Sequence, residues 1–99
     1  MPFEYSLPHA FSIRSIRAHA PAVSGVYGIS NSREWIYIGQ SDDIQGRLMD
    51  HLTELTLRRR EPTGFVYEVC EPSERTIRQN RLVVEYEPVC NRPGMAKLD

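Results

Sequence analysis

The sequence predicts a small α+β domain, layered like an α/β sandwich, in which helices flank a three-stranded sheet that begins with a β-hairpin. Three observations predict this fold. Two β-rich runs surround a polar turn within residues 25–39, apolar side chains recur at helical spacing within residues 42–56, and a strand-like run at 65–70 precedes a second helical segment. Strands and helices in this order predict a sheet covered by two or three helices.

The length of 99 residues predicts one domain over 1–99, and we expect residues 1–10 and 93–99 to be irregular. The net charge of −1 argues against a nonspecific, high-affinity coat for nucleic acid but leaves a local basic face open. No apolar run approaches the roughly 20 residues of a membrane span. The first residues do not resemble a secretory signal. We therefore expect a cytoplasmic protein that does not enter membranes.

The cysteine and arginine contents narrow the chemistry only slightly. Cys70 and Cys90 lie far apart without further Cys or His at ligand spacing, which argues against zinc and favours reduced thiols over a disulfide. Eleven of the twelve cationic residues are arginine. The planar guanidinium suits phosphate and carboxylate, but a GC-rich genome produces the same bias, so both explanations stay open.

The first elements are a short helix and the hairpin. Residues 12–19 are predicted to form the helix, with Ile13 and Ile16 on one side. In the hairpin, a three-residue turn at 31–33 places Tyr27 opposite Tyr37, so the two phenols share one face. The other face is apolar and suits the core; it holds Val26, Ile36 and Ile38.

The second helix is predicted from about Asp42 to Thr56, with Ser41 as its N-cap. Arg47 and His51 are four residues apart, so they lie together on one helix face. The neighbouring face carries an apolar stripe, formed by Ile44, Leu48, Leu52 and Leu55.

The last elements are a strand at 65–70 and a helix from about 72 to 86, which Pro88 ends. The helix takes its apolar surface from Ile77, Leu82 and Val84. The loop at 58–64 opens with three arginines. We interpret this run as a solvated loop in preference to a DNA-contacting patch.

Several landmarks, spread over about residues 22–92, resemble the signature of the GIY-YIG nuclease family. Arg47 follows the second tyrosine by ten residues, and His51 follows four residues later, as in that family. The matching residues are Gly25-Val26-Tyr27, Tyr37-Ile38-Gly39, Arg47, His51, Pro88 and Asn91.

This resemblance implies the GIY-YIG endonuclease fold and metal-assisted hydrolysis of DNA phosphodiesters with Mg²⁺ or Mn²⁺, in DNA repair, recombination or restriction. It implies catalytic roles for Tyr27, Tyr37, Arg47, His51 and Asn91. The candidate phosphate-binding residues are Arg47, Gln40 and Arg78.

One position departs from the family pattern. Family members carry a metal-binding glutamate twelve residues before the asparagine, and that count from Asn91 arrives at Gln79. An amide oxygen can ligate a divalent cation but lacks the charge that holds Mg²⁺. Gln79 is therefore the candidate metal residue, and it leaves the chain's status as an enzyme undecided.

Plainer interpretations remain for the same residues. Tyr27 and Tyr37 alone fit cross-strand packing, and His51 alone fits a surface residue. Three functions follow: a metal-dependent DNA endonuclease, a catalytically inactive domain that still binds nucleic acid, and a protein-interaction module. Because so small a domain holds no separate targeting module, a protein partner or a homodimer is a further expectation.

Overall fold

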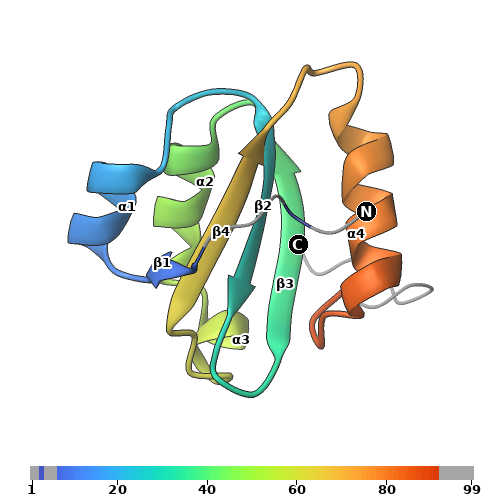
Figure 1. Cartoon of the computed structure of the whole chain (residues 1–99). Coiled ribbons are helices and arrows are strands. Elements are labelled where there is room, and N and C mark those ends of the chain that lie inside the picture. The colour runs from blue at the N-terminus through green and yellow to red at the C-terminus, as the bar shows by residue number, and fades with distance from the viewer. Residues whose placement is uncertain (1–2, 4–6, 92–99) are drawn as a thin grey trace.

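The structure is a computed structural model, and it describes residue 3 and residues 7–91. One antiparallel sheet separates two helical layers, and the helices α1, α2 and α3 lie on one side of it while α4 lies on the other (Figure 1). The elements in chain order are β1 (His9–Ala10), α1 (Ile13–His19), β2 (Gly25–Ser30), β3 (Trp35–Ser41), α2 (Ile44–His51), α3 (Leu55–Arg58), β4 (Gly64–Val69) and α4 (Arg75–Tyr86).

The α+β class is confirmed, but the sheet has four strands where three were predicted. Its order is β1-β4-β2-β3, and every neighbouring pair is antiparallel. The additional strand pairs His9 with Phe65 and Ala10 with Gly64. Two residues are too short to produce an alternating pattern, so the expectation of an irregular segment at 1–10 is wrong at this point. Residues 93–99, also expected to be irregular, lie outside the described residues.

The hairpin differs from its predicted register by two residues. Tyr27 lies opposite Gly39, and Tyr37 lies opposite Ile29. The turn is closed by Asn31, whose side-chain oxygen accepts hydrogen bonds from the backbone N–H groups of residues 33 and 34. Because side chains alternate with a period of two, a shift of two residues by itself leaves Tyr27 and Tyr37 on the face predicted for them.

A β-bulge in β3 overturns one part of that prediction. Ser30 pairs with Trp35 while the next residue, Ile29, pairs with Tyr37, so Ile36 is the extra residue. The bulge reverses the alternation locally. Ile36 therefore packs with the residues beneath α1 and α2, whereas Ile38 packs with those beneath α4.

The helix predicted over 42–56 is two helices. Asp43, rather than Ser41, is the N-cap of α2, and its carboxylate accepts from the N–H of Gly46 at 2.9 Å. After His51 the chain tightens through hydrogen bonds between residues three apart, including Glu54 N–H to the His51 carbonyl. The chain therefore leaves the α2 axis, and Leu57 is buried in place of the predicted Leu55, which is 67% exposed.

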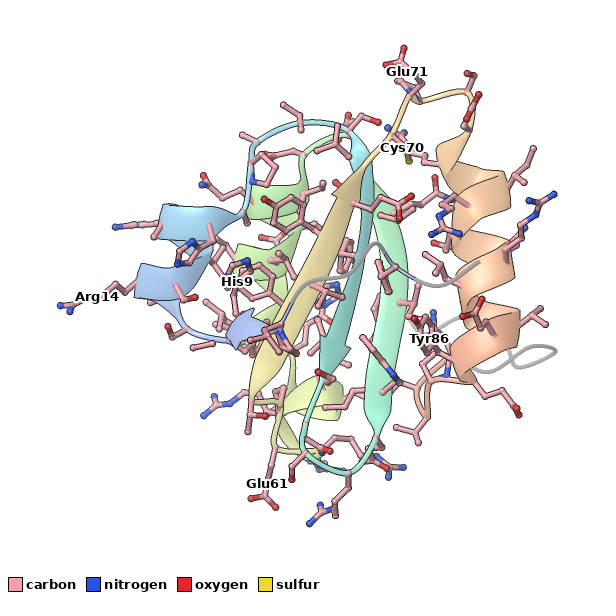
Figure 2. All side chains as sticks on the ribbon, viewed as in Figure 1. His9, Arg14, Glu61, Cys70, Glu71 and Tyr86 are labelled. Atoms are coloured by element: carbon pink, nitrogen blue, oxygen red, sulfur yellow. The ribbon has the colours of Figure 1, made fainter. Side chains whose placement is uncertain are left out.

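The first and last helices lie where predicted, but their apolar faces are narrower. In α1 only Ile16 is buried, and Ile13 is exposed. In α4 only Leu82 is fully buried, and both Ile77 and Val84 are exposed. Tyr86 reaches from α4 towards β3 (Figure 2), where its ring lies 4.7 Å from that of Trp35.

Two further expectations concern the thiols and membranes. Cys70 and Cys90 are both free, which confirms the expectation of free thiols. Among the residues that the structure describes, no helix has the length and apolar character needed to cross a membrane.

Candidate active site

The two tyrosines of the hairpin lie side by side on the face of the sheet that α2 covers. Tyr27 belongs to the central strand β2 and Tyr37 to the edge strand β3, and their ring centroids are 6.2 Å apart. Gly39 makes this arrangement possible, because a Cβ atom there would lie 2.5 Å from the Tyr27 hydroxyl and 2.8 Å from the Tyr37 ring. The glycine of the second triplet thus leaves the space that the first tyrosine fills.

The glycine of the first triplet serves the docking of α2. A Cβ atom at Gly25 would collide with the backbone carbonyl of Glu68 and would lie 2.7 Å from the side chain of Ile44, the first residue of α2. With no side chain at this point, the start of α2 lies directly against β2. The position of α2 along the sheet follows from that contact.

Helix α2 brings His51 against both phenols. The Nε2 atom of His51 lies 2.7 Å from the Tyr27 hydroxyl, and the two residues are 1% and 0% exposed. The imidazole ring also lies 5.0 Å from the ring of Tyr37, between centroids. A polar group is buried at low cost only when it is hydrogen-bonded, and this contact satisfies the Tyr27 hydroxyl and the Nε2 atom of His51 inside the core.

Burial also decides the charges of this pair. It raises the pKa of the Tyr27 phenol well above its ordinary value, an effect increased by Tyr37 and opposed by the nearby guanidinium of Arg47. Burial lowers the pKa of His51, an effect that Glu54 partly opposes. Both groups are therefore neutral near pH 7.

Arg47 stands at the rim of the same cluster. Its guanidinium lies 3.8 Å from Asp50 and 3.7 Å from Glu54, and its side chain is 39% exposed. The site therefore has two layers. Tyr37 and Arg47 are accessible at the surface, whereas Tyr27 and His51 form a buried layer beneath them.

Asn91 supports the site from outside. Its side-chain oxygen accepts from the N–H of Ile38 at 3.2 Å, and its amide nitrogen donates to the carbonyl of the same residue at 2.5 Å. The backbone N–H groups of residues 89 and 90 donate to the carbonyls of Trp35 and Ile36. The chain after α4 therefore covers the edge of β3 and holds the strand that carries Tyr37.

Three of the predicted site residues belong to the α4 side of the sheet instead. Gln40 donates to Thr76 at 3.0 Å and accepts from Arg75 at 3.1 Å. Arg78 makes a two-pronged ion pair with Glu68, at 2.7 and 2.8 Å. The amide of Gln79 donates to Asn80 at 3.5 Å.

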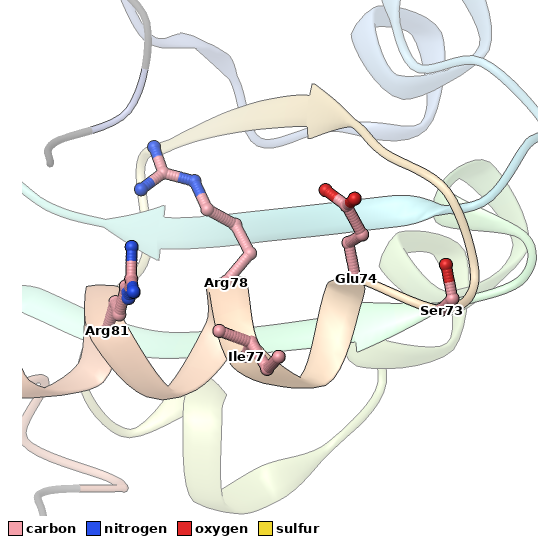
Figure 3. A pocket seen from close by; sticks show the side chains of 5 residues that line it. All are labelled: Ser73, Glu74, Ile77, Arg78 and Arg81. Carbon is pink, nitrogen blue, oxygen red and sulfur yellow. The ribbon is translucent and has the colours of Figure 1, made fainter.

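A pocket of about 350 Å³ also lies on the α4 side (Figure 3). Its lining shares no residue with the tyrosine cluster. The lining residues are Ser73, Glu74, Ile77, Arg78 and Arg81. Because it has an exposed apolar side chain and an arginine already paired with Glu68, we do not place the chemistry there.

Glu54 is the residue that the sequence analysis missed. Its carboxylate lies 3.1 Å from Nδ1 of His51, although the ring N–H is not aligned for a hydrogen bond. The only signal in the sequence is its place three residues after His51. Within a continuous helix that spacing is common on any surface, so it did not single Glu54 out.

Solved structures share the fold of this chain. The N-terminal GIY-YIG endonuclease domain of UvrC from Thermotoga maritima, bound to magnesium, superposes with a TM-score of 0.65 at 30% identity, covering 77% of this chain and 91% of that chain. A point mutant of the same domain, bound to its catalytic divalent cation, gives a TM-score of 0.65 at 30% identity over 77% and 90% of the two chains. This chain belongs to the GIY-YIG endonuclease family. No protein-family profile and no curated protein matches it.

The GIY-YIG cluster of this chain does not present the donors that a divalent cation prefers. Mg²⁺ is commonly held by one or two carboxylates together with water. Within residue 3 and residues 7–91, no group of three or more His, Cys, Asp or Glu side chains could hold a metal ion. Glu54 already faces Arg47 and His51, and Gln79 offers only a neutral oxygen.

Proposed function

We propose that this GIY-YIG domain acts on the phosphodiester backbone of DNA, as an endonuclease whose metal-assisted cleavage is impaired by Gln79. The observation that supports the proposal is the partly exposed side chain of Arg47, which interacts with both Tyr27 and Tyr37 at the rim of the buried Tyr27–His51 pair. A guanidinium binds phosphate through two parallel hydrogen bonds. Arg47 and Tyr37 are therefore the groups that meet the substrate.

The residues around the site have different roles. Both ion pairs of Arg47 are long and solvent-exposed, and such pairs contribute about 0–1 kcal/mol, so a phosphate can replace them. Tyr27 and His51 support Tyr37 from beneath and keep its ring in place. Asn91 holds the backbone of the same strand, so we propose it as a positioning residue.

Catalytic inactivity with retained nucleic-acid binding is the second candidate. The neutral side chain at position 79 favours it, because without a carboxylate at that position the chain lacks the charge that recruits Mg²⁺ or Mn²⁺ in the family. A role as a protein-interaction module has the near-neutral net charge as its only support.

Nicking of supercoiled plasmid with Mg²⁺ or Mn²⁺ separates the first two candidates. We expect weak nicking or none by the unchanged protein, and metal-dependent nicking by Gln79→Glu. Adding Arg47→Ala to that variant should abolish the gain. Equal nicking by the unchanged protein and Gln79→Glu would refute the impairment. No nicking by either, with binding intact, would favour the inactive DNA-binding domain.

Fluorescence anisotropy with a DNA duplex at several salt concentrations tests binding itself. Arg47→Ala should weaken binding by roughly tenfold and lower the salt slope by about one. Arg14→Ala is the matched control, because Arg14 projects from α1 away from the sheet (Figure 2). Arg78→Ala tests a second of the three candidate phosphate ligands. An affinity for DNA that changes neither with salt concentration nor with Arg47→Ala would refute a DNA-binding role.

A further inference from the structure

Only one of the two ring nitrogens of buried His51 has a hydrogen-bond partner. Its Nε2 atom pairs with the Tyr27 hydroxyl at 2.7 Å, whereas Nδ1 is buried without a hydrogen bond. The Oε1 atom of Glu54 lies 3.1 Å from Nδ1. The Glu54 side chain is 39% exposed, so it has room to turn its carboxylate towards Nδ1. Because buried polar atoms nearly always have a hydrogen-bond partner, the Glu54 carboxylate is the candidate partner of Nδ1.

The carboxylate also decides which imidazole nitrogen carries the proton. A neutral imidazole has one donor and one acceptor nitrogen. If Nδ1 were the acceptor, its lone pair would face a negatively charged oxygen at 3.1 Å, which is repulsive. The proton therefore resides on Nδ1, and Nε2 must accept a hydrogen bond from the Tyr27 hydroxyl.

We propose that Glu54 is a positioning residue of this site: its carboxylate holds His51 as the Nδ1–H tautomer, so that Nε2 accepts from Tyr27, and it draws Arg47 to the same rim. The consequence for cleavage rests on the proposed function, but the tautomer does not. Glu54 occupies this place because the chain leaves the α2 axis after His51 and turns into α3.

Several charged or titratable groups surround His51, and their effects differ in sign. Glu54 and the more distant Asp50 favour the imidazolium, and Arg47 opposes it. The aromatic neighbours are Tyr27 on β2 and Tyr37 on β3. Among these groups Glu54 alone faces Nδ1 at contact distance in the described structure. Its removal should therefore change the tautomer of His51, whereas removal of the other groups should not.

Long-range ¹H–¹⁵N NMR spectra of the full chain across a pH series read this tautomer directly. In the unchanged protein we expect a protonated Nδ1, an unprotonated Nε2 and a His51 pKa below the ordinary value. In Glu54→Leu the tautomer signals should move towards a mixture. Glu54→Gln keeps an acceptor oxygen without charge, so it should lower the pKa of His51 further. Asp50→Asn, the matched control, removes a carboxylate that faces Arg47 and should preserve the tautomer.

An Nε2–H tautomer in the unchanged protein would overturn the proposal. So would a tautomer and a pKa that both variants leave untouched. If Glu54→Leu does not fold, the unchanged protein and Glu54→Gln still decide. In the Gln79→Glu background, Glu54→Gln should shift the acid limb of the nicking profile to lower pH. Absent nicking with the expected NMR result would refute the proposed function and leave the role of Glu54 standing.

Discussion

The two faces of the sheet bury different kinds of core. The face beneath α1–α3 encloses a hydrogen-bonded tyrosine and histidine among aliphatic residues. The face beneath α4 is apolar at its centre and adds an aromatic group in which the Trp35 ring contacts those of Phe3 and Tyr86, with centroids 5.7 and 4.7 Å away. Polar side chains of that second face, such as Arg78 with Glu68, form their pairs at its partly exposed rim.

This difference indicates that the face beneath α1–α3 carries the candidate site and that the face beneath α4 supports it. A polar pair inside a core specifies geometry sharply, because any displacement leaves a buried group unsatisfied. An apolar core tolerates small shifts of its members. The face with the Tyr27–His51 pair is therefore the one that holds reactive groups in place. The α4 face supports the edge strand from the opposite side.

The largest expected effects come from matched cavities in the two faces. Leu48 on α2 and Leu82 on α4 are both fully buried. Replacing either by alanine should cost about 2–5 kcal/mol of unfolding free energy, because the loss includes both burial and a cavity. Urea denaturation measures both variants. A cost well under 1 kcal/mol for one of them would mean that its face contributes little to folding.

Alanine substitutions of one glycine on each face compare how tightly the two faces are packed. Gly39→Ala places a methyl group 2.5 Å from the buried Tyr27 hydroxyl, whereas Gly28→Ala meets Trp35 at 2.8 Å on the α4 face. We expect Gly39→Ala to cost about 1–3 kcal/mol through overpacking. Gly28→Ala should cost less, because half-buried Trp35 can move aside. Thermal unfolding of the two variants checks this order, and a larger cost for Gly28→Ala would contradict it.

Removal of one hydroxyl on each face tests the value of burial. Tyr27→Phe leaves Nε2 of buried His51 without its partner, which should cost about 1–2 kcal/mol. Tyr86→Phe removes only the acceptor for the Phe3 N–H, at 3.2 Å in a partly buried place. That loss should be about 0.5–1 kcal/mol. Chemical denaturation followed by circular dichroism compares them, and equal costs would weaken the distinction between the faces.

The smallest expected effect is a dependence of stability on pH. Burial lowers the pKa of His51 in the folded protein below its unfolded value of about 6.5. As pH falls below about 6.5, the unfolded chain binds a proton that the folded protein refuses, so stability present above that pH declines towards the folded pKa. The midpoint of thermal unfolding should thus be lower at pH 6.0 than at pH 7.5.

His9, which is only half-buried, provides the control for this pH dependence of stability. His51→Gln should reduce the decline most. His9→Gln should reduce it less, because burial and the nearby His19 also lower the pKa of His9 but its ring is only half-buried. An unchanged decline in His51→Gln would show that other groups cause it.

Part of this site was predictable because it follows from local periodicity. Alternation in the hairpin places Tyr27 and Tyr37 on one face, and it did so despite a register error of two residues. Helical spacing places Arg47 beside His51. The bulge at Ile36 and the two-residue strand β1 were not predictable, because neither leaves a repeating pattern.

The candidate site divides in the same way. The residue types at 27, 37, 47 and 51 and the amide at 79 are properties of the sequence, as is the resemblance that links them. Only the tertiary structure decided that Tyr27 and His51 are buried together, that Arg47 and Tyr37 remain accessible, that Arg78 pairs with Glu68, and that Glu54 meets Nδ1. Periodicity is set by the backbone of one segment, whereas burial and polar pairing depend on which segments meet across the sheet.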